Sequence, residues 1–558
     1  MQKDGSRIRE TLAELYSGET LQRACNLIKQ ELYAWRTQAE GTRPLTEKDA
    51  MLITYGDAIT RDGEKPLQTL RTFLNEHLDG EITNVHLLPI FPYTSDDGFS
   101  VADYQTVDPA LGSWEDVTAL GQDFGVMLDA VVNHTSQSHE WFQRCLRCET
   151  PYRDYYIACD PNADYTSVIR PRTLPLLTAF QTAEGQKHYW TTFSEDQVDV
   201  NYSSPELLRE IIHVLLTYAS YGARFIRLDA IGFAWKQQGT GCMSLPKTHT
   251  LVRLMRQALE ITYPDTKIIT ETNVPHEENI SYFGEGNEAH LVYQFPLPPL
   301  TMFTLLTQNA ERLTSWAAGL AKTPLKPDTT YFNFLASHDG IGFRPVLGIL
   351  DEQERQILLD ATVSHGGRIG YKSTLDGGVI PYELNINYMD ALTDPSELDD
   401  SRLARFMAAQ AIMLSMPGLP GIYYHSLFGS RNWSDGMLES GVNRRINREK
   451  LKADTLAKEL AQKDSLRARV LAAYRVLLRA RGASSAFSPY ASQTVLQLEP
   501  RVFALERFDR KSGERVSVRI NVSSEPITLN EQLTGIDLLS EGTPLEALAP
   551  YQTRWIRR

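Results

Sequence analysis

The amino-acid sequence predicts an α/β protein built on a (β/α)8 TIM barrel, in which eight parallel strands alternate with helices. Short β-prone runs recur between residues 51 and 425, and amphipathic helical stretches separate most of them. Two gaps in this rhythm are too long for one loop and one helix, which indicates insertions. After about residue 485 the pattern changes to short alternating runs. The barrel is therefore expected to carry a small antiparallel β domain behind it.

The elements follow in chain order. Residues 1–50 have helical spacing without a strong strand, so we expect a helical extension on the outside of the barrel. The barrel itself is expected to comprise residues 51–134 and 201–485. Its eight strands are predicted at residues 51–55, 85–91, 126–134, 223–232, 267–272, 290–295, 331–338 and 421–425.

Both insertions follow predicted strands. Residues 135–200 come after strand three and are expected to form an inserted subdomain, and residues 340–400 come after strand seven as a second subdomain or long loop. Because both leave from the carboxyl ends of strands, both should overhang the mouth where such barrels carry their active sites. Residues 486–558 are predicted as the C-terminal β domain.

Composition excludes several classes of protein. The net charge of −14 disfavours binding to nucleic acid or to an anionic membrane. The charged start lacks the apolar core of a secretory signal, and the longest apolar stretch is broken by Pro417 and Gly418, so we expect a cytoplasmic chain without a transmembrane segment. Five sparse cysteines suit a reducing compartment, and their single C-x-x-C pair is not expected to hold a metal.

The run 225–233 is apolar and β-prone, yet it holds two opposite charges. Arg227 and Asp229 are two residues apart, so on a strand both side chains point to the same face. Asp229 lies near the carboxyl end of predicted strand four, which makes it a candidate nucleophile. The alternative is a buried structural ion pair.

Two further acids stand at strand ends. Glu271 ends strand five and Asp339 follows strand seven, and each alone could be a helix cap or an ion-pair partner. Three carboxylates at one mouth repel one another, so their surroundings must fix which of them is protonated. Arg227 is expected to depress the pKa of Asp229, as a nucleophile requires, whereas Glu271 has apolar neighbours that suit a general acid/base. Asp339 is expected to hold sugar hydroxyls and to stabilise positive charge in the transition state.

Other polar residues accompany the acids. His134 and His338 are suited to hydrogen-bond sugar hydroxyls, and their alternative is a core histidine bonded to a backbone carbonyl. Asp57, after strand one, and Arg444, after strand eight, are expected to close the ring around a sugar. Their alternatives are a helix cap and a surface charge.

Several segments carry a family resemblance. Residues 128–134, 227–232, Glu271 and 337–340 resemble the four signature regions of the α-amylase clan of glycoside hydrolases. Residues 52–57, 112–114, 170–172, 193 with 197–199, 239–242 and 338–342 are similar to the sucrose phosphorylase branch of that clan, family 13.

The resemblance implies retaining phosphorolysis of an α-glucoside. In that reaction Asp229 would form a β-glucosyl ester, Glu271 would donate a proton to the leaving group, and inorganic phosphate would release α-glucose 1-phosphate. Phosphate is thus a co-substrate; the branch implies no cofactor and no metal. The positions that hold glucose in this branch are Asp57, His134, Phe193, Gln197, Arg227, His338 and Arg444.

The acceptor side follows from the same resemblance. Arg172 falls on a loop arginine that receives phosphate, and Tyr382 on a tyrosine of the acceptor loop, here within 340–400. Ile380 stands where sucrose phosphorylases usually have an Asp that grips fructose. Residues 170–180 and Trp235-Lys236 look closer to the glucosylglycerate phosphorylases, which implies phosphorolysis of 2-O-α-D-glucosylglycerate to α-D-glucose 1-phosphate and D-glycerate.

Within that acceptor site, Lys236 and Arg172 are expected to accommodate the carboxylate of glycerate, because a carboxylate needs cationic partners. Phe233 is expected to line the same site. The partners are therefore a small glucoside and phosphate, without nucleic acid or membrane.

Alternative functions stay open at this point. Sucrose, sucrose 6-phosphate or glucosylglycerol could be the glucoside. A hydrolase or transglucosidase would act without phosphate. A non-catalytic sugar-binding relative would be expected to lack one of the three carboxylates, and all three are present.

Overall fold

The computed structural model describes residues 2–35, 41–78, 80–374, 378–529, 534–540 and 547–558. The remaining positions are 1, 36–40, 79, 375–377, 530–533 and 541–546. The parts of the predicted N-terminal extension, barrel, second insertion and C-terminal domain that fall on them lie outside the described residues.

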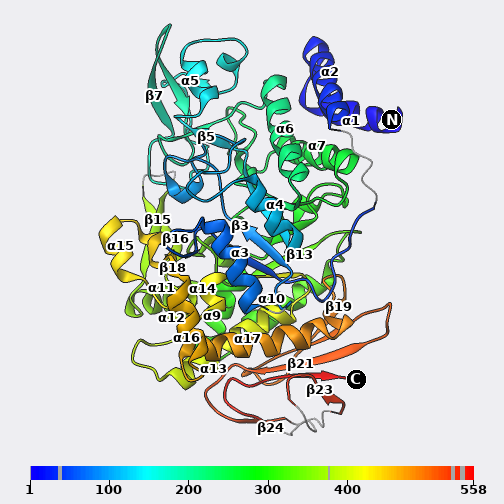
Figure 1. Ribbon diagram of the computed structural model, residues 1–558, viewed down its shortest axis with the longest axis vertical. Coiled ribbons are helices and arrows are strands. Elements are labelled where there is room, and N and C mark those ends of the chain that lie inside the picture. The colour runs from blue at the N-terminus through cyan, green and yellow to red at the C-terminus, as the bar shows by residue number, and fades with distance from the viewer. Residues whose placement is uncertain (1, 36–40, 79, 375–377, 530–533, 541–546) are drawn as a thin grey trace.

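Eight parallel strands close a barrel, which confirms the predicted fold class (Figure 1). In chain order they are β1(Met51–Thr54), β3(Asn84–Leu87), β4(Gly125–Val131), β10(Ala223–Asp229), β11(Lys267–Thr270), β12(Leu291–Tyr293), β13(Thr330–Phe334) and β17(Leu419–Tyr423). All the predicted strands are present, but several end earlier than expected. His134 and His338 lie beyond the last barrel residue, because the polar segments at the mouth leave the sheet and turn over its end.

Helices cover the outside of the barrel. Helix α6(Pro205–Ser220) shows why these segments are helical: Pro205 occupies its first turn, the side chain of Ser204 accepts from the backbone N–H of Leu207, and Ile211 and Leu215 face inward. Burying each such aliphatic side chain contributes about 1.5–3 kcal/mol. In the described part of the chain, no helix combines the length and the hydropathy needed to cross a membrane.

The N-terminal helices α1(Gln2–Leu15) and α2(Gly18–Ala34) pack against α7(Pro246–Thr262) and α6, on the outside of the barrel (Figure 1). Ile28 is fully buried in this contact, and the hydroxyl of Tyr16 donates to the carbonyl oxygen of Tyr202 at 2.7 Å. These residues therefore cover the barrel's helices and stand away from its mouth.

Two excursions leave from the carboxyl ends of barrel strands. After β4, the short pair β5(His134–Ser136) and β9(Gln197–Asp199) frames a segment that holds β6(Ala158–Cys159), β7(Leu177–Thr182) and β8(Gly185–Trp190). After β13, β14(Ile341–Gly342), β15(Arg368–Ser373) and β16(Val379–Asn385) form a second small antiparallel sheet, with α11(Glu352–Ser364) beside it.

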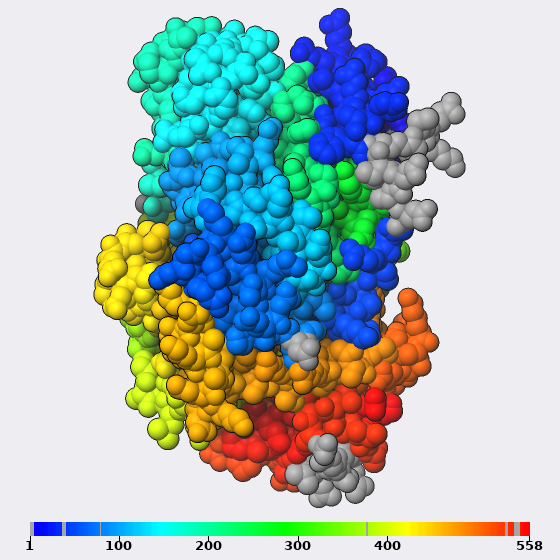
Figure 2. All heavy atoms as spheres, viewed as in Figure 1, coloured from blue at the N-terminus to red at the C-terminus, as the bar shows by residue number. Residues whose placement is uncertain are grey.

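Helix α17(Leu466–Gly482) leads into an antiparallel sheet of β19(Ser492–Leu496), β20(Val502–Phe508), β21(Arg515–Asn521), β25(Thr553–Arg557) and β23(Ile536–Asp537). Trp555 anchors this sheet to the barrel, because its indole N–H donates to the hydroxyl of Ser415 in α13(Asp399–Ser415) at 3.1 Å. Figure 2 shows this C-terminal part at one end of the molecule and the first inserted segment at the other.

Candidate active site

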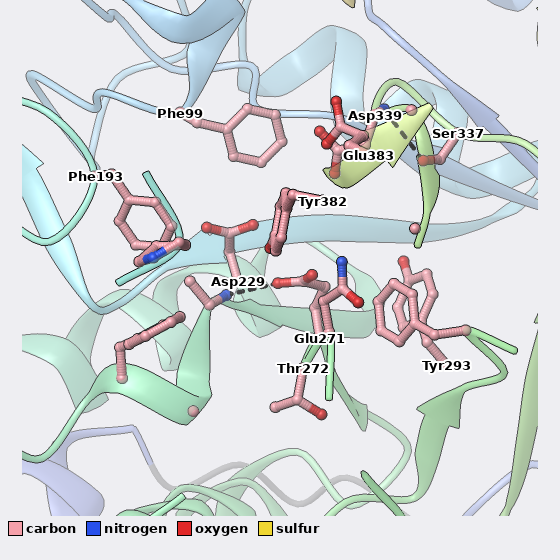
Figure 3. Close-up of a pocket in the computed structure, with 18 of the residues that line it drawn as sticks. Phe99, Phe193, Asp229, Glu271, Thr272, Tyr293, Ser337, Asp339, Tyr382 and Glu383 are labelled. Carbon is pink, nitrogen blue, oxygen red and sulfur yellow. Dashed lines mark hydrogen bonds between the residues drawn. The ribbon is translucent and has the colours of Figure 1, made fainter. Parts of the chain in front are cut away.

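A cavity opens at the carboxyl ends of the barrel strands, beneath both excursions (Figure 3). It brings together most of the predicted site residues. Those that line it are Asp229, Glu271, Asp339, His134, Phe193, Gln197, Arg227, His338, Arg444, Arg172, Phe233 and Tyr382.

The cavity floor is formed by Arg227, Asp229 and Glu271 at the ends of β10 and β11, and Arg227 contacts both acids. One guanidinium nitrogen, Nη1, lies 2.7 Å from Oδ1 of Asp229 and also donates to Asp129 on β4. Its Nε donates to the hydroxyl of Tyr293 at 3.1 Å, and Nη2 lies 3.9 Å from Oε2 of Glu271. The arginine side chain is only 3% exposed. A buried cation tied to three strands fixes the position of Asp229.

The second carboxylate of the floor is held by the backbone. Oε2 of Glu271 accepts from the N–H of Ala230 at 3.0 Å, and Ala230 adopts the left-handed conformation with φ of 49°. That turn ends β10 and aims its N–H across the mouth. Figure 3 shows the carboxylates of Asp229 and Glu271 turned toward the same space, with the ring of Tyr382 beside them.

The pKa values of the two acids depend mainly on burial. Burial raises the pKa of Glu271 to about 7, and the negative charges of Asp229 and Asp339 add to this shift, while Arg227 opposes it. Burial also raises the pKa of Asp229, although its ion pair with Arg227 pulls in the other direction. The expected net depression of the Asp229 pKa is therefore wrong, because loss of hydration outweighs the lowering by Arg227.

Asp339 shows the opposite balance. Burial disfavours its charge, but Arg444 and Arg448 together hold its pKa below the usual range. Nη1 of Arg444 lies 2.6 Å from Oδ1 of Asp339, and the same guanidinium donates to Glu383 on β16 at 2.9 and 2.6 Å. Arg444, predicted to hold glucose, thus joins the end of β13 to the second excursion.

The polar side chains around the floor form one network. Nε2 of His134 lies 2.9 Å from the carbonyl oxygen of Phe99, and the amide of Gln197 lies 3.2 Å from the same nitrogen. The ring of His338 stacks on Phe99 with centroids 4.7 Å apart. Burial, with Arg448 and Arg227 nearby, lowers the pKa of His338 well below its usual value. His338 is therefore a neutral imidazole that can exchange hydrogen bonds with a sugar.

Asp57 does not line this cavity, which corrects its predicted place in the ring. Its carboxylate is paired with Lys450 at 2.5 Å, and both residues line a neighbouring cavity that also holds Asp97 and Arg448. The ion pair keeps the Asp57 side chain on that side of the mouth. Asp96 takes the expected place instead, lining the central cavity with Oδ2 at 3.4 Å from the amide of Gln197.

Lys236 is also misplaced by the sequence prediction. Its ammonium lies 2.6 Å from Asp199 and 2.8 Å from the side-chain oxygen of Asn133, and it donates to the carbonyl oxygen of Phe233. The side chain is 5% exposed, and its hydrogen-bonding capacity is used inside this network. Lys236 therefore holds strands together beneath the mouth and does not reach an acceptor.

Some lining residues were not predicted. Asp96 belongs to a Ser-Asp-Asp-Gly turn in the segment that follows β3, and it adopts φ of 55°; such a turn after a barrel strand is a signal that could have indicated it. Glu383 directly follows Tyr382 in the acceptor stretch. Arg344 and Lys372 line the cavity from the second excursion, and in sequence they resemble ordinary solvated cations.

Across the residues that the structure places, no three His, Cys, Asp or Glu side chains gather closely enough to hold a metal ion.

Comparison with known proteins finds an alpha-amylase domain and several similar phosphorylases. A model of the alpha-amylase catalytic domain matches residues 78–364. The chain is 50% identical over 514 residues to a glucosylglycerate phosphorylase from Allomeiothermus silvanus, covering 92% of this chain and 91% of that protein. It is 44% identical over 517 residues to a glucosylglycerate phosphorylase from Escherichia coli K12, covering 92% of each.

More distant relatives share the same branch. A sucrose phosphorylase from Streptococcus mutans is 27% identical over 505 residues, covering 88% of this chain and 99% of that protein. Among solved structures, a sucrose 6F-phosphate phosphorylase from Thermoanaerobacter thermosaccharolyticum superposes with a TM-score of 0.74 at 25% identity, covering 87% of this chain and 96% of that one.

Proposed function

The chain belongs to the α-amylase family, and on that premise we propose that it catalyses phosphorolysis of 2-O-α-D-glucosylglycerate to α-D-glucose 1-phosphate and D-glycerate. The observation that carries the proposal is the buried pair Asp229 and Glu271, which share one cavity and differ in how Arg227 stabilises their charges. Identity of 44–50% to glucosylglycerate phosphorylases, over about nine-tenths of the chain, supports this choice of glucoside.

In the first step Asp229 attacks the anomeric carbon and the bond to the glycerate oxygen breaks. Glu271 gives its proton to that oxygen, so glycerate leaves as the alcohol and a β-glucosyl ester remains. The geometry suits this division of roles. Arg227 is 2.7 Å from Asp229 but 3.9 Å from Glu271, so its positive charge favours the ionised form of Asp229 more strongly. Glu271, with a pKa of about 7, holds the proton.

In the second step phosphate replaces glycerate. An oxygen of phosphate attacks the anomeric carbon, the ester bond to Asp229 breaks, and the Glu271 carboxylate takes the proton that phosphate loses. Two inversions at the same carbon give net retention. Arg172 lies on the first excursion, close enough to Asp339 and Tyr382 to influence their pKa values, and is the cation that would receive the phosphate.

Asp339 and the remaining lining residues would bind the glucosyl unit. Asp339 stays ionised, since Arg444 and Arg448 hold its pKa low, and it can stabilise positive charge at the anomeric carbon. His134, Asp96 and Gln197 offer hydrogen bonds on one side of the cavity, and Phe193 offers an apolar face. Arg227 and His338 complete the set, with Phe233 and Tyr382 toward the acceptor.

Phosphate is the second substrate, and we assign no cofactor or metal. A cytoplasmic location stays a prediction from the sparse cysteines.

The test is release of α-glucose 1-phosphate from glucosylglycerate, from glucosylglycerol and from sucrose, each with and without inorganic phosphate. The proposal expects rapid, phosphate-dependent release from glucosylglycerate and slow release from the other two. Preference for sucrose would refute the choice of glucoside. Free glucose released at the same rate without phosphate would make the enzyme a hydrolase.

A further inference from the structure

Two cations of the second excursion face the mouth from outside the catalytic floor. Arg344 follows β14, and Lys372 lies on β15. Both are half-buried and line the central cavity, and both also line a wider outer cavity of about 740 Å³ that adjoins it. They therefore stand where the central cavity meets the outer one.

Neither cation has a carboxylate partner in the described part of the chain. Among the residues that the structure describes, no carboxylate lies within ion-pair distance of Arg344 or Lys372, whereas Arg444, Arg445 and Arg448 each pair with one. Glu383, the carboxylate of the neighbouring strand, is held by Arg444. Asp164, an acid on the outer cavity's lining, accepts from the backbone N–H and the hydroxyl of Thr166 at 2.9 and 2.6 Å.

The two charges also destabilise each other. Partial burial lowers the pKa of the Lys372 ammonium, and the positive charge of Arg344 lowers it further. The ammonium lies 5.6 Å from the centroid of the Tyr382 ring, so it leans toward the acceptor loop. Two like charges near each other are unfavourable, and an anion bound between them would relieve the repulsion.

We propose that Arg344 and Lys372 form the site that binds the carboxylate of the glycerate leaving group and so determine the acceptor. This inference rests on the proposed function and adds residues to it. Arg344 and Lys372 take the carboxylate-binding role that the sequence predicted for Lys236, whose ammonium is already bound to Asp199.

The proposed carboxylate site at Arg344 and Lys372 lies farther from the anomeric carbon than the phosphate site does. Phosphate must reach the anomeric carbon itself, beside Asp229 and Glu271. Arg172 is close enough to this place to lower the pKa of Asp339. Glycerate carries its carboxylate on the carbon beyond the glycosidic oxygen, so the charge lies farther out. Arg344 and Lys372 border the outer cavity as well as the central one, as Arg170 also does, whereas Arg172 lines the central cavity and not the outer one.

The test is glucosyl transfer from α-glucose 1-phosphate by the full chain, with D-glycerate or neutral glycerol as acceptor. Arsenolysis of α-glucose 1-phosphate is measured in parallel, because it needs the glucosyl ester and the phosphate site but no acceptor. Arg344→Gln and Lys372→Gln should each raise KM for glycerate about 10-fold or more, with KM for glycerol and the arsenolysis rate within about 2-fold of wild type.

Matched variants control for folding. Arg368→Gln removes an exposed cation from the same strand as Lys372 and should change none of the three activities. Lys372→Arg keeps the charge and should restore most of the glycerate reaction. Loss of arsenolysis in parallel with loss of the glycerate reaction would assign the cations to phosphate and overturn the inference, as would unchanged KM for glycerate.

Failure of the proposed function gives a different pattern. A wild-type enzyme that arsenolyses α-glucose 1-phosphate but does not glucosylate glycerate would refute the choice of glucoside. In that case the two variants are compared on the preferred acceptor. Loss confined to an anionic acceptor would uphold the cation site, and preference for a neutral acceptor would overturn it.

Discussion

The charged side chains of the cavity floor are paired with neighbouring protein groups, whereas those of the outer wall of the mouth have no described carboxylate partner. On the floor, Arg227, Asp229 and Glu271 come from barrel strands or their ends, and neighbouring strands and backbone N–H groups hold each of them. On the outer wall, Arg344 and Lys372 come from an excursion and have no carboxylate partner among the described residues. The groups proposed to break bonds are thus fixed by the fold, whereas the charges of the groups proposed to select the acceptor would be neutralised by the ligand.

The largest expected effect distinguishes two aspartates that line neighbouring cavities at the mouth. Asp96 lines the central cavity, and Asp57 is paired with Lys450 in the neighbouring one. Asp96→Asn should lower kcat/KM for glucosylglycerate about 10- to 100-fold, because a charge-assisted hydrogen bond to the sugar is lost. Asp57→Asn should change it less than about 3-fold, since a half-exposed ion pair contributes little. Steady-state kinetics of the two variants decide it.

Equal losses in both variants would return Asp57 to the sugar site and contradict the arrangement of the two cavities. Thermal melting of each variant checks that neither loss reflects unfolding.

A smaller effect concerns pH. With a pKa of about 7, Glu271 loses its proton as the pH rises, so kcat/KM for glucosylglycerate should fall toward one-tenth per pH unit above about 7. The sign follows from its role as the acid: only the protonated form serves the leaving oxygen. The profile is measured as initial rates across the range in which the protein stays folded.

An α-glucosyl fluoride provides the control, because fluoride departs without a proton. Its reaction should lack the alkaline decline. The same decline with both substrates would show that a group other than Glu271 causes it.

Much of the floor could be predicted because barrel geometry converts sequence position into spatial position. The two-residue spacing of Arg227 and Asp229 fixes their common face, and strand ends fix where Glu271 lies. The pKa of Asp229 was mispredicted because sequence shows the neighbouring charge but not the depth of burial. Burial proved to be the larger effect.

The outer residues could not be located for a different reason. Asp57 and Lys236 each pair with a residue that is distant in sequence or on another strand, and those pairs decide which way the side chains point. Arg344 and Lys372 are placed by a small antiparallel sheet whose packing over the mouth has no signal in the sequence.

The measurement that tests the central claim most directly is the mass of the protein after reaction with α-glucosyl fluoride. Glu271→Gln should accept the glucosyl group from this substrate, which needs no acid, but should pass it on slowly, because no base assists the second step. The account predicts a mass gain of one glucosyl unit, mapped by peptide analysis to Asp229, and no gain when Asp229→Asn is added. A glucosyl group on another residue, or an undiminished gain in the double variant, would contradict it.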